Sequence, residues 1–476
     1  MKTISKWFIF SLVAIAQFMV VLDNAITNVA LPSIEKELNF SASNLQWVVT
    51  SYALFFGGFL LLGGRFADLY GRKRTLIIGM AMFTLFSLLI GLSQEPWQLI
   101  GLRALQGLSG AFMSPAALSI VLVTFRDGTA RNQALSYWTL VSTGGAAAGL
   151  LLGGALTQYL GWRWNFFINV PIGIIITALI AQYIPTNEKE EKDKKLDVMG
   201  AVLVTSSLML FVLGLSEAPQ WGWLSLATLS TIFVSIVLMG AFIANESRVR
   251  RPLMPLSIFR IRNVRGANMI MAPLFATMLG SFFVMTLYLQ GIMKLDPLMT
   301  GLAFLPFPIT LAIMSSRMPK LVARYGYKRF LIIGPLFVIA GMLWLANLHV
   351  DSTYLLGIFP STILIPLGIG MTMMPTIAAA TSGVPADESG LASGLASTSQ
   401  QMGGALGLAV ISGAAASVTL GMSNPTSPDA LLSGYHAAFY IAAAFMVIAT
   451  IIAILVIRDR KPSDQHAASH AAVVEA

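Results

Sequence analysis

The chain has 476 residues, of which 56% are hydrophobic and 11% are charged, and its formal net charge is +9. This composition excludes an ordinary soluble domain and is typical of a protein that crosses a membrane many times. The sequence holds no cysteine, which excludes disulfides and thiol chemistry.

Apolar segments recur along the whole chain, most of them near or above the roughly 20 residues that a membrane-spanning helix needs. Every backbone amide in lipid must be paired within the protein, so spans of this kind must be helices. We predict an all-α polytopic membrane protein with 14 transmembrane helices. The predicted spans are 7–31, 45–64, 75–93, 98–125, 134–157, 166–184, 197–216, 223–243, 266–291, 301–316, 330–348, 354–382, 391–421 and 435–457.

The basic residues test this arrangement, because Lys and Arg concentrate in cytoplasmic loops. If both termini lie in the cytoplasm, all but four of the 30 Lys and Arg residues fall on the inner side. The exceptions are Lys36, Arg163 and Lys294 in outside loops and Arg103 inside a span. We therefore interpret the positive charge as a topology signal and expect no nucleic-acid partner. The arginines between positions 248 and 265 also fit binding to anionic lipid.

An internal repeat divides the chain. Segment 71–79 resembles segment 326–334, and the glycines of 145–149 resemble those of 403–407, at a nearly constant offset. This pattern predicts two six-helix halves with two extra helices between them. The predicted units are an N-terminal half (1–186), a charged linker with the two extra helices (187–263), a C-terminal half (264–457) and a disordered cytoplasmic tail (458–476).

Asp23 is a lone carboxylate inside the first predicted span. A charge at this depth costs roughly 2.5–3.5 kcal/mol, so it should face a cavity or a partner and serve function. Asn24 and Thr27 lie within helical reach of it and form a polar stripe. We predict a proton or cation site; the alternative is a carboxylate held by water near the outer interface. Four other acids are expected in outside loops: Glu217, Asp296, Asp351 and Asp429.

The segment after the second span reads GGRFADLYGRKR, residues 63–74. Gly64 permits close helix approach, and Gly71 lies between the spans. Asp68 and Arg72 can form a charge-assisted latch at the cytoplasmic surface. The alternative is that the basic residues here only set topology.

Arg103 is the only cation that we place at membrane depth, in the pattern Leu99-x-x-x-Arg103-x-x-Gln106-Gly107. Lipid exposure would be expensive, so Arg103 should face the bundle and pair with another group. A buried cation would also tune a nearby carboxylate. The alternative is that it snorkels from a helix end. In the fifth span, four small residues predict tight helix packing: Gly145, Gly149, Gly153 and Gly154.

These motifs resemble those of the major facilitator superfamily and, more closely, its fourteen-helix drug:proton antiporter branch, the quaternary-ammonium and multidrug resistance type. Segment 22–32 (LDNAITNVALP) resembles the signature of that branch. Ala25 departs from the hydroxyl residue common there, and Leu150 replaces the proline of the antiporter motif. The resemblance implies that the latch closes the inner side in the outward-open state and that Arg103 takes part in proton coupling.

We expect a secondary transporter rather than an enzyme, in the bacterial plasma membrane, that exports lipophilic neutral or monocationic compounds by alternating access. In the expected cycle, protonation of Asp23 from outside favours the inward-open state, where substrate binds and displaces the proton toward the cytoplasm. An exporter or flippase of lipid-like molecules is one alternative, and Leu150 keeps a proton-coupled uptake symporter open as another.

The proton gradient is the expected driving force, without cofactor or metal. The expected partners are small lipophilic substrates, protons and membrane lipids, and the expected state is a monomer. Polar or aromatic residues within spans are the candidates for the substrate cavity: Gln17, Asn24, Asn28, Tyr52, Gln106, Trp138, Asn268, Gln290 and Gln401.

Overall fold

The computed structural model describes residues 5–125, 128–185, 196–249, 252–384 and 389–458. In this part of the chain 14 helices are long and apolar enough to cross a membrane, and no strand occurs. The all-α prediction and the number of spans are therefore confirmed. Most of the predicted linker (187–195) and almost all of the predicted tail (459–476) lie outside the described residues.

The helices fall into three sets in chain order. The first helix group comprises α1 (Lys6–Leu38), α2 (Ala42–Leu45), α3 (Trp47–Tyr70), α4 (Arg72–Gly91), α5 (Pro96–Thr124), α6 (Gly128–Tyr159), α7 (Trp164–Phe167) and α8 (Asn169–Tyr183). The middle pair is α9 (Val198–Trp221) and α10 (Leu226–Arg248). The last helix group comprises η1 (Leu256–Arg260), α11 (Arg262–Leu287), η2 (Tyr288–Ile292), α12 (Pro297–Phe304), α13 (Pro306–Tyr325), α14 (Lys328–Leu345), η3 (Tyr354–Ile358), α15 (Phe359–Thr381), α16 (Ser389–Leu420) and α17 (Pro428–Leu455).

Several helices extend past the apolar segments that predicted them. The short tenth span is completed by α12 and α13, which together cover Pro297–Tyr325. Two acids expected in loops lie in helices instead: Glu217 is in α9, and Asp429 is in the first turn of α17. The difference arises because helical hydrogen bonding continues into the polar interface, whereas an apolar run ends at the first charged residues.

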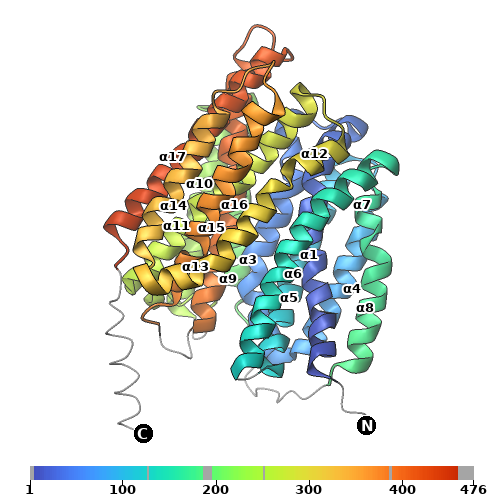
Figure 1. The fold of residues 1–476 in the computed structure, drawn as a ribbon, viewed down its shortest axis with the longest axis vertical. Coiled ribbons are helices and arrows are strands. Elements are labelled where there is room, and N and C mark those ends of the chain that lie inside the picture. Colours follow the sequence, from blue (N-terminus) through green and yellow to red (C-terminus); the bar gives the residue numbers. More distant parts are fainter. Residues whose placement is uncertain (1–4, 126–127, 186–195, 250–251, 385–388, 459–476) are drawn as a thin grey trace.

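The first and last helix groups stand side by side, on the right and left of Figure 1 respectively. They approach each other at the top of this view, where α12 crosses toward the first group, and diverge toward the bottom. Helix α1 begins and α17 ends at the bottom, which we call the terminal face. Helix α9 packs against both α3 and α16, so the middle pair touches both groups.

The sequence repeat corresponds to repeated geometry. Gly71 and Gly326 have φ angles of 104° and 78° at the ends of α3 and α13, a conformation that favours glycine. Two residues later, Lys73 Nζ donates to the Ala181 carbonyl (2.8 Å) and Lys328 Nζ donates to the Ile454 carbonyl (2.9 Å). Each lysine thus binds the carbonyl end of the last helix of its group, where a cation is favourable.

The repeated glycines also occupy matching contacts. An added Cβ on Gly149 would lie 2.6 Å from Ala25 Cβ in α1, and one on Gly407 would lie 2.0 Å from Ala276 Cβ in α11. In both groups the fifth span therefore packs directly on the first. These contacts support two related halves, whose boundaries remain a prediction.

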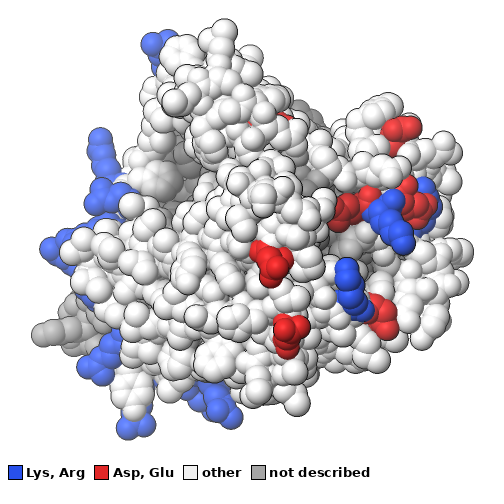
Figure 2. All heavy atoms as spheres, turned by 90° about the horizontal axis from the view of Figure 1, so that it is seen from above, with Lys and Arg blue, Asp and Glu red and all other residues white. Residues whose placement is uncertain are grey.

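The face opposite the termini carries few charges (Figure 2). Most of its atoms belong to uncharged residues, and many of the Lys and Arg side chains in this view stand on its rim. Glu37 accepts hydrogen bonds from Trp162 Nε1 (2.7 Å) and from the Arg163 guanidinium, which ties α1 to the loop before α7. Orientation with both termini in the cytoplasm remains a prediction.

Candidate functional site

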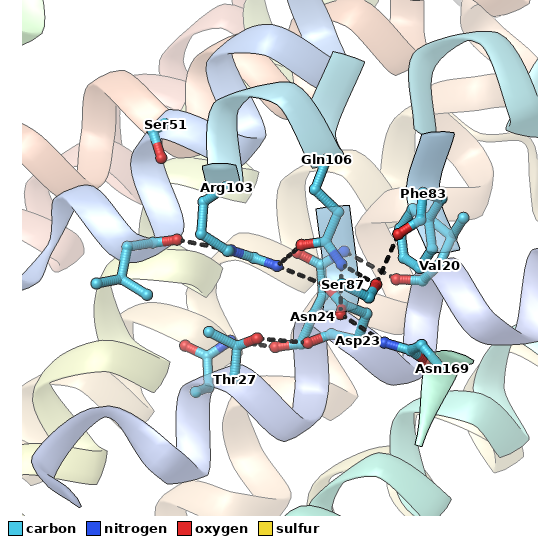
Figure 3. Close-up of polar contacts among 12 residues, drawn as sticks. Val20, Asp23, Asn24, Thr27, Ser51, Phe83, Ser87, Arg103, Gln106 and Asn169 are labelled. Carbon is cyan, nitrogen blue, oxygen red and sulfur yellow. Dashed lines mark hydrogen bonds and ion pairs between the residues drawn. The ribbon is translucent and has the colours of Figure 1, made fainter. Parts of the chain in front are cut away.

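Asp23 is fully buried, and its carboxylate accepts hydrogen bonds from two other helices (Figure 3). Oδ2 accepts from Arg103 Nη1 at 2.5 Å. Oδ1 accepts from Gln106 Nε2 at 2.9 Å and from Asn169 Nδ2 at 3.0 Å. Three N–H donors around two oxygens match the needs of an ionised carboxylate. The acid therefore faces a charged partner rather than lipid.

Arg103 is also fully buried and is held on several sides. Its Nε donates to the Val48 carbonyl of α3 (3.0 Å), and Nη1 also donates to Gln106 Oε1 (2.6 Å). Its guanidinium lies 4.4 Å from the centre of the Tyr52 ring, within cation–π range. Snorkelling is thus wrong for this residue. We call Asp23, Arg103, Gln106 and Asn169, with Tyr52, the Asp23 cluster.

Two members of this network were not chosen from the sequence as site residues. Asn169 opens α8, and Ser87 of α4 accepts from Gln106 Nε2 at 2.8 Å. Both are polar residues in otherwise apolar spans, the same signal that identified Asp23. Many Ser and Asn residues lie within apolar spans, so this feature alone could not identify Ser87 and Asn169 before the fold was known.

A cavity of about 1530 Å³ lies between the first and last helix groups. Its apolar wall includes Phe56, Phe275, Phe282 and Phe307, and its polar lining includes Gln17, Asn24, Ser114, Gln400 and Gln401. Charged lining residues are Arg65, Asp68, Arg131 and Asp197. The cavity reaches the terminal face, where these four charges lie.

The cavity is lined by Asn24 and not by Asp23. Consecutive residues of a helix point in directions about 100° apart, so the two side chains face different surroundings. Asp23 is enclosed within the first helix group, beside the cavity rather than between the groups. Phe56 links the two sites, because its ring lines the cavity and stacks on Tyr52 with centroids 5.8 Å apart.

Of the candidate cavity residues, Gln17, Asn24 and Gln401 line the cavity, and the others do not. Tyr52 and Gln106 belong to the Asp23 cluster. The remaining four make contacts elsewhere: Asn28 Nδ2 donates to the Asn24 carbonyl (2.8 Å), Asn268 Oδ1 accepts from Ser399 (2.7 Å), Gln290 Nε2 donates to the Val29 carbonyl (2.9 Å), and Trp138 packs against the core of the first group. Polarity within a span identified these residues without showing which side of each helix they occupy.

The latch residues lie at the terminal face. Arg72 Nη2 and Asp68 Oδ1 are 3.5 Å apart, and both side chains are partly exposed. The close helix approach predicted at Gly64 occurs at Gly63, where an added Cβ would lie 2.2 Å from the Ala111 carbonyl oxygen. At Gly64 the nearest atom, Pro115 Cβ, would be 3.7 Å away, and Gly64 lines the cavity instead.

The glycines of α6 divide between two partners. Gly145, Gly149 and Gly153 pack on α1, whereas an added Cβ on Gly154 would lie 2.6 Å from the Pro297 carbonyl oxygen in the first turn of α12. On the other side of this contact, a Cβ on Gly301 would lie 2.2 Å from the Leu150 carbonyl oxygen. The two groups therefore touch backbone to backbone at the end of the cavity farthest from the terminal face.

Comparison with protein families matches residues 13–408 to the Major Facilitator Superfamily. The puromycin resistance protein pur8 of Streptomyces alboniger is 36% identical over 96% of this chain and 92% of its own length. The cephamycin export protein CmcT of Amycolatopsis lactamdurans is 37% identical over 92% and 90%. The tetracenomycin C resistance and export protein of Streptomyces glaucescens is 34% identical over 84% and 74%.

Solved structures with a similar fold are more distant in sequence. The nucleoside transporter NupG superposes with a TM-score of 0.67 at 12% identity, over 95% of this chain and 100% of that chain. An auto-inhibited peptide transporter of the POT family gives a TM-score of 0.66 at 18% identity, over 93% and 96%. At these identities the likeness concerns the fold alone.

Proposed function

This chain belongs to the major facilitator superfamily of membrane transporters, and from this premise we propose that it exports lipophilic neutral or singly charged compounds in exchange for protons. Relatives that match most of the chain are named for resistance to puromycin and for export of cephamycin and tetracenomycin C. These names support a drug-like organic substrate and outward transport.

We place the terminal face in the cytoplasm. The ends of α3, α4, α6 and α14 that meet this face carry Arg65, Arg72, Lys73, Arg131 and Lys328. Lys and Arg are enriched on the cytoplasmic side of membrane proteins. With this orientation the cavity is open to the cytoplasm and closed toward the outside, as an exporter requires when it collects substrate.

The observation that carries the proposal is the burial of Asp23 against Arg103 beside the cavity. A buried ion pair is costly to break by removing one charge, because the other is left uncompensated, at about 3–5 kcal/mol. Protonation of Asp23 is such a change, so proton binding must be coupled to rearrangement around Arg103. Three N–H donors suit an ionised carboxylate, so we assign this geometry to the step of the cycle that follows displacement of the proton toward the cytoplasm.

Two short routes connect substrate with this proton site. Asn24 lines the cavity and is the chain neighbour of Asp23 in α1. Phe56 also lines it and stacks on Tyr52, whose ring in turn faces the Arg103 guanidinium. A substrate that moves either side chain shifts the surroundings of the pair. One proton exchanged for a neutral substrate supplies about 2.3 kcal/mol per 100 mV, whereas exchange for a monocation moves no net charge and is driven by the pH difference.

The cavity favours neutral or singly charged amphipaths. Its lining is aromatic and aliphatic around a few amide and hydroxyl groups, and its charged residues lie at the mouth. An apolar wall with a few polar groups suits amphipathic ligands of varied structure. A dication would need further carboxylates in the inner part, where the described lining offers none.

Proton release on ligand binding tests the proposal. Purified protein in weakly buffered detergent is mixed with a lipophilic monocation such as tetraphenylphosphonium, and a pH-sensitive dye reports released protons. We expect markedly less release from Asp23→Asn than from the wild type, with binding of a neutral compound still measurable in the variant. Equal release from both proteins would exclude Asp23 as the coupled site.

A further inference from the structure

A second pair of buried carboxyl groups lies where the middle pair of helices meets the cavity mouth. Asp197 precedes α9 and is 7% exposed, and Glu246 lies in the last turn of α10 and is 4% exposed. Asp197 lines the cavity, as do Pro252, Leu253 and Pro255 of the segment that follows α10. Neither acid belongs to the Asp23 cluster.

The hydrogen bonds of this pair are unequal. Asp197 Oδ1 accepts from Gly200 N (2.8 Å) and Asn245 Nδ2 (3.0 Å), and Oδ2 accepts from Asn245 Nδ2 (2.9 Å). Glu246 Oε2 accepts from Met254 N (2.8 Å). The other Glu246 oxygen, Oε1, is buried without a hydrogen-bond partner. A buried carboxylate oxygen without a donor is costly.

The two carboxyl groups converge on one point beside Gly200. A Cβ added to Gly200 would lie 2.6 Å from Asp197 Oδ2 and 2.7 Å from Glu246 Oε1. Both oxygens therefore approach a space that exists because residue 200 has no side chain. Two carboxylates in such proximity do not both remain ionised, and one proton between them removes the repulsion.

The surroundings fit a proton better than a metal ion. Hard metal cations take about six or more oxygen ligands, whereas two carboxyl oxygens converge here. Asp197 is the charged group that acts on Glu246 among the described residues. The other charged residues of α9 and α10 are Glu217, at the far end of α9, and the exposed Arg248. Helix α3, which packs on α9, contributes Arg65 and Asp68 to the same cavity mouth.

We propose that Asp197 and Glu246 form a second proton-binding site, in which Glu246 Oε1 carries a proton and donates it to Asp197 Oδ2. The shared proton supplies the missing partner of Oε1 and leaves one negative charge on the pair. Its loss adds a second negative charge there, so a cationic amphipath entering the cavity competes with the proton. The site does not depend on the proposed export function.

Infrared spectroscopy of the full-length protein in lipid nanodiscs tests the site, because a protonated carboxyl group has its own C=O stretching band. The Asp23→Asn background removes the contribution of the first site. We expect a protonated-carboxyl band near neutral pH that is lost in Glu246→Gln. We expect the band to be lost in Asp197→Asn as well. Asparagine keeps the helix cap, and its N–H group donates to Glu246 Oε1 in place of the shared proton, so Glu246 becomes ionised. Glu217→Gln, a change in the same helical hairpin, retains the band.

Two results would overturn the proposal. A band unchanged in Glu246→Gln would place the proton elsewhere, and a band that survives Asp197→Asn would mean that Glu246 holds its proton without sharing it. The Asp23→Asn protein with Asp197 and Glu246 intact gives a further check. If it shows no protonated-carboxyl band near neutral pH, there is no shared proton.

Discussion

Replacement of Arg103 by methionine should destabilise the protein strongly and in a pH-dependent way. Arg103 and Asp23 are both fully buried, and Arg103 supplies the 2.5 Å contact to the carboxylate. Methionine is similar in length and apolar, so the main loss is the positive charge and its N–H donors. Leaving a buried charge without its partner costs about 3–5 kcal/mol.

The sign of the pH dependence follows from the charge that remains. In Arg103→Met the ionised Asp23 carboxylate is unfavourable and the protonated form is not, so the loss of stability is largest at high pH and shrinks as the pH falls. Asp23→Asn in the same protein should recover most of the loss at neutral pH. Unfolding in mixed micelles, followed by tryptophan fluorescence at several pH values, measures both effects.

A matched control exists at the surface. Arg163 pairs with Glu37, but both side chains are substantially exposed, so Arg163→Met should cost at most about 1 kcal/mol and show little recovery from a second change at Glu37. If Arg103→Met cost no more than Arg163→Met, or if Asp23→Asn gave no recovery, the reasoning from a buried ion pair would be refuted.

Two further predictions concern the closed end of the cavity and the link to the proton site. Gly301→Leu should separate α12 from the Leu150 carbonyl and favour opening at the face opposite the termini, whereas Gly144→Leu, which has no atom within 4 Å of an added Cβ, should not. Labelling of single cysteines introduced near this contact measures the opening at that face. The natural sequence holds no cysteine that would react as well. Phe56→Leu should reduce substrate-induced proton release severalfold while binding persists, because Phe56 lines the cavity and stacks on Tyr52. Phe55 stacks on Phe59 and does not line the cavity, so Phe55→Leu should leave proton release unchanged.

The number of spans and the burial of Asp23 and Arg103 inside the bundle could be anticipated from the sequence because both follow from the cost of polarity in lipid. Long apolar runs must be helices, and a charge at depth must face the bundle rather than lipid. That Asp23 and Arg103 pair with each other required the fold, which brings α1 against α5. The repeat also had a direct geometric meaning, since Gly71 and Gly326 both require positive φ.

Features that depend on helix rotation could not be anticipated. Asp23 and Asn24 are adjacent and polar, yet only Asn24 reaches the cavity. The sequence does not show which of the adjacent glycines Gly63 and Gly64 allows close helix approach, and in the fold it is Gly63 that packs against Ala111. Spans that are apolar on all sides carry little periodicity from which a facing direction can be inferred.

The carboxyl pair at the cavity mouth was missed for a different reason. Asp197 and Glu246 lie at the ends of α9 and α10, where charged residues usually meet water. In the fold, Met254 N of the segment after α10 donates to Glu246, and Asn245 of α10 donates to Asp197. Such tertiary contacts leave no mark in hydropathy.

Transport in proteoliposomes with an imposed pH gradient tests the central claim most directly. Wild-type protein should concentrate a lipophilic monocation on the acidic side of the membrane when the terminal face lies on the other side. Asp23→Asn should bring the substrate only to equilibrium. Accumulation by Asp23→Asn at the wild-type level would contradict the account.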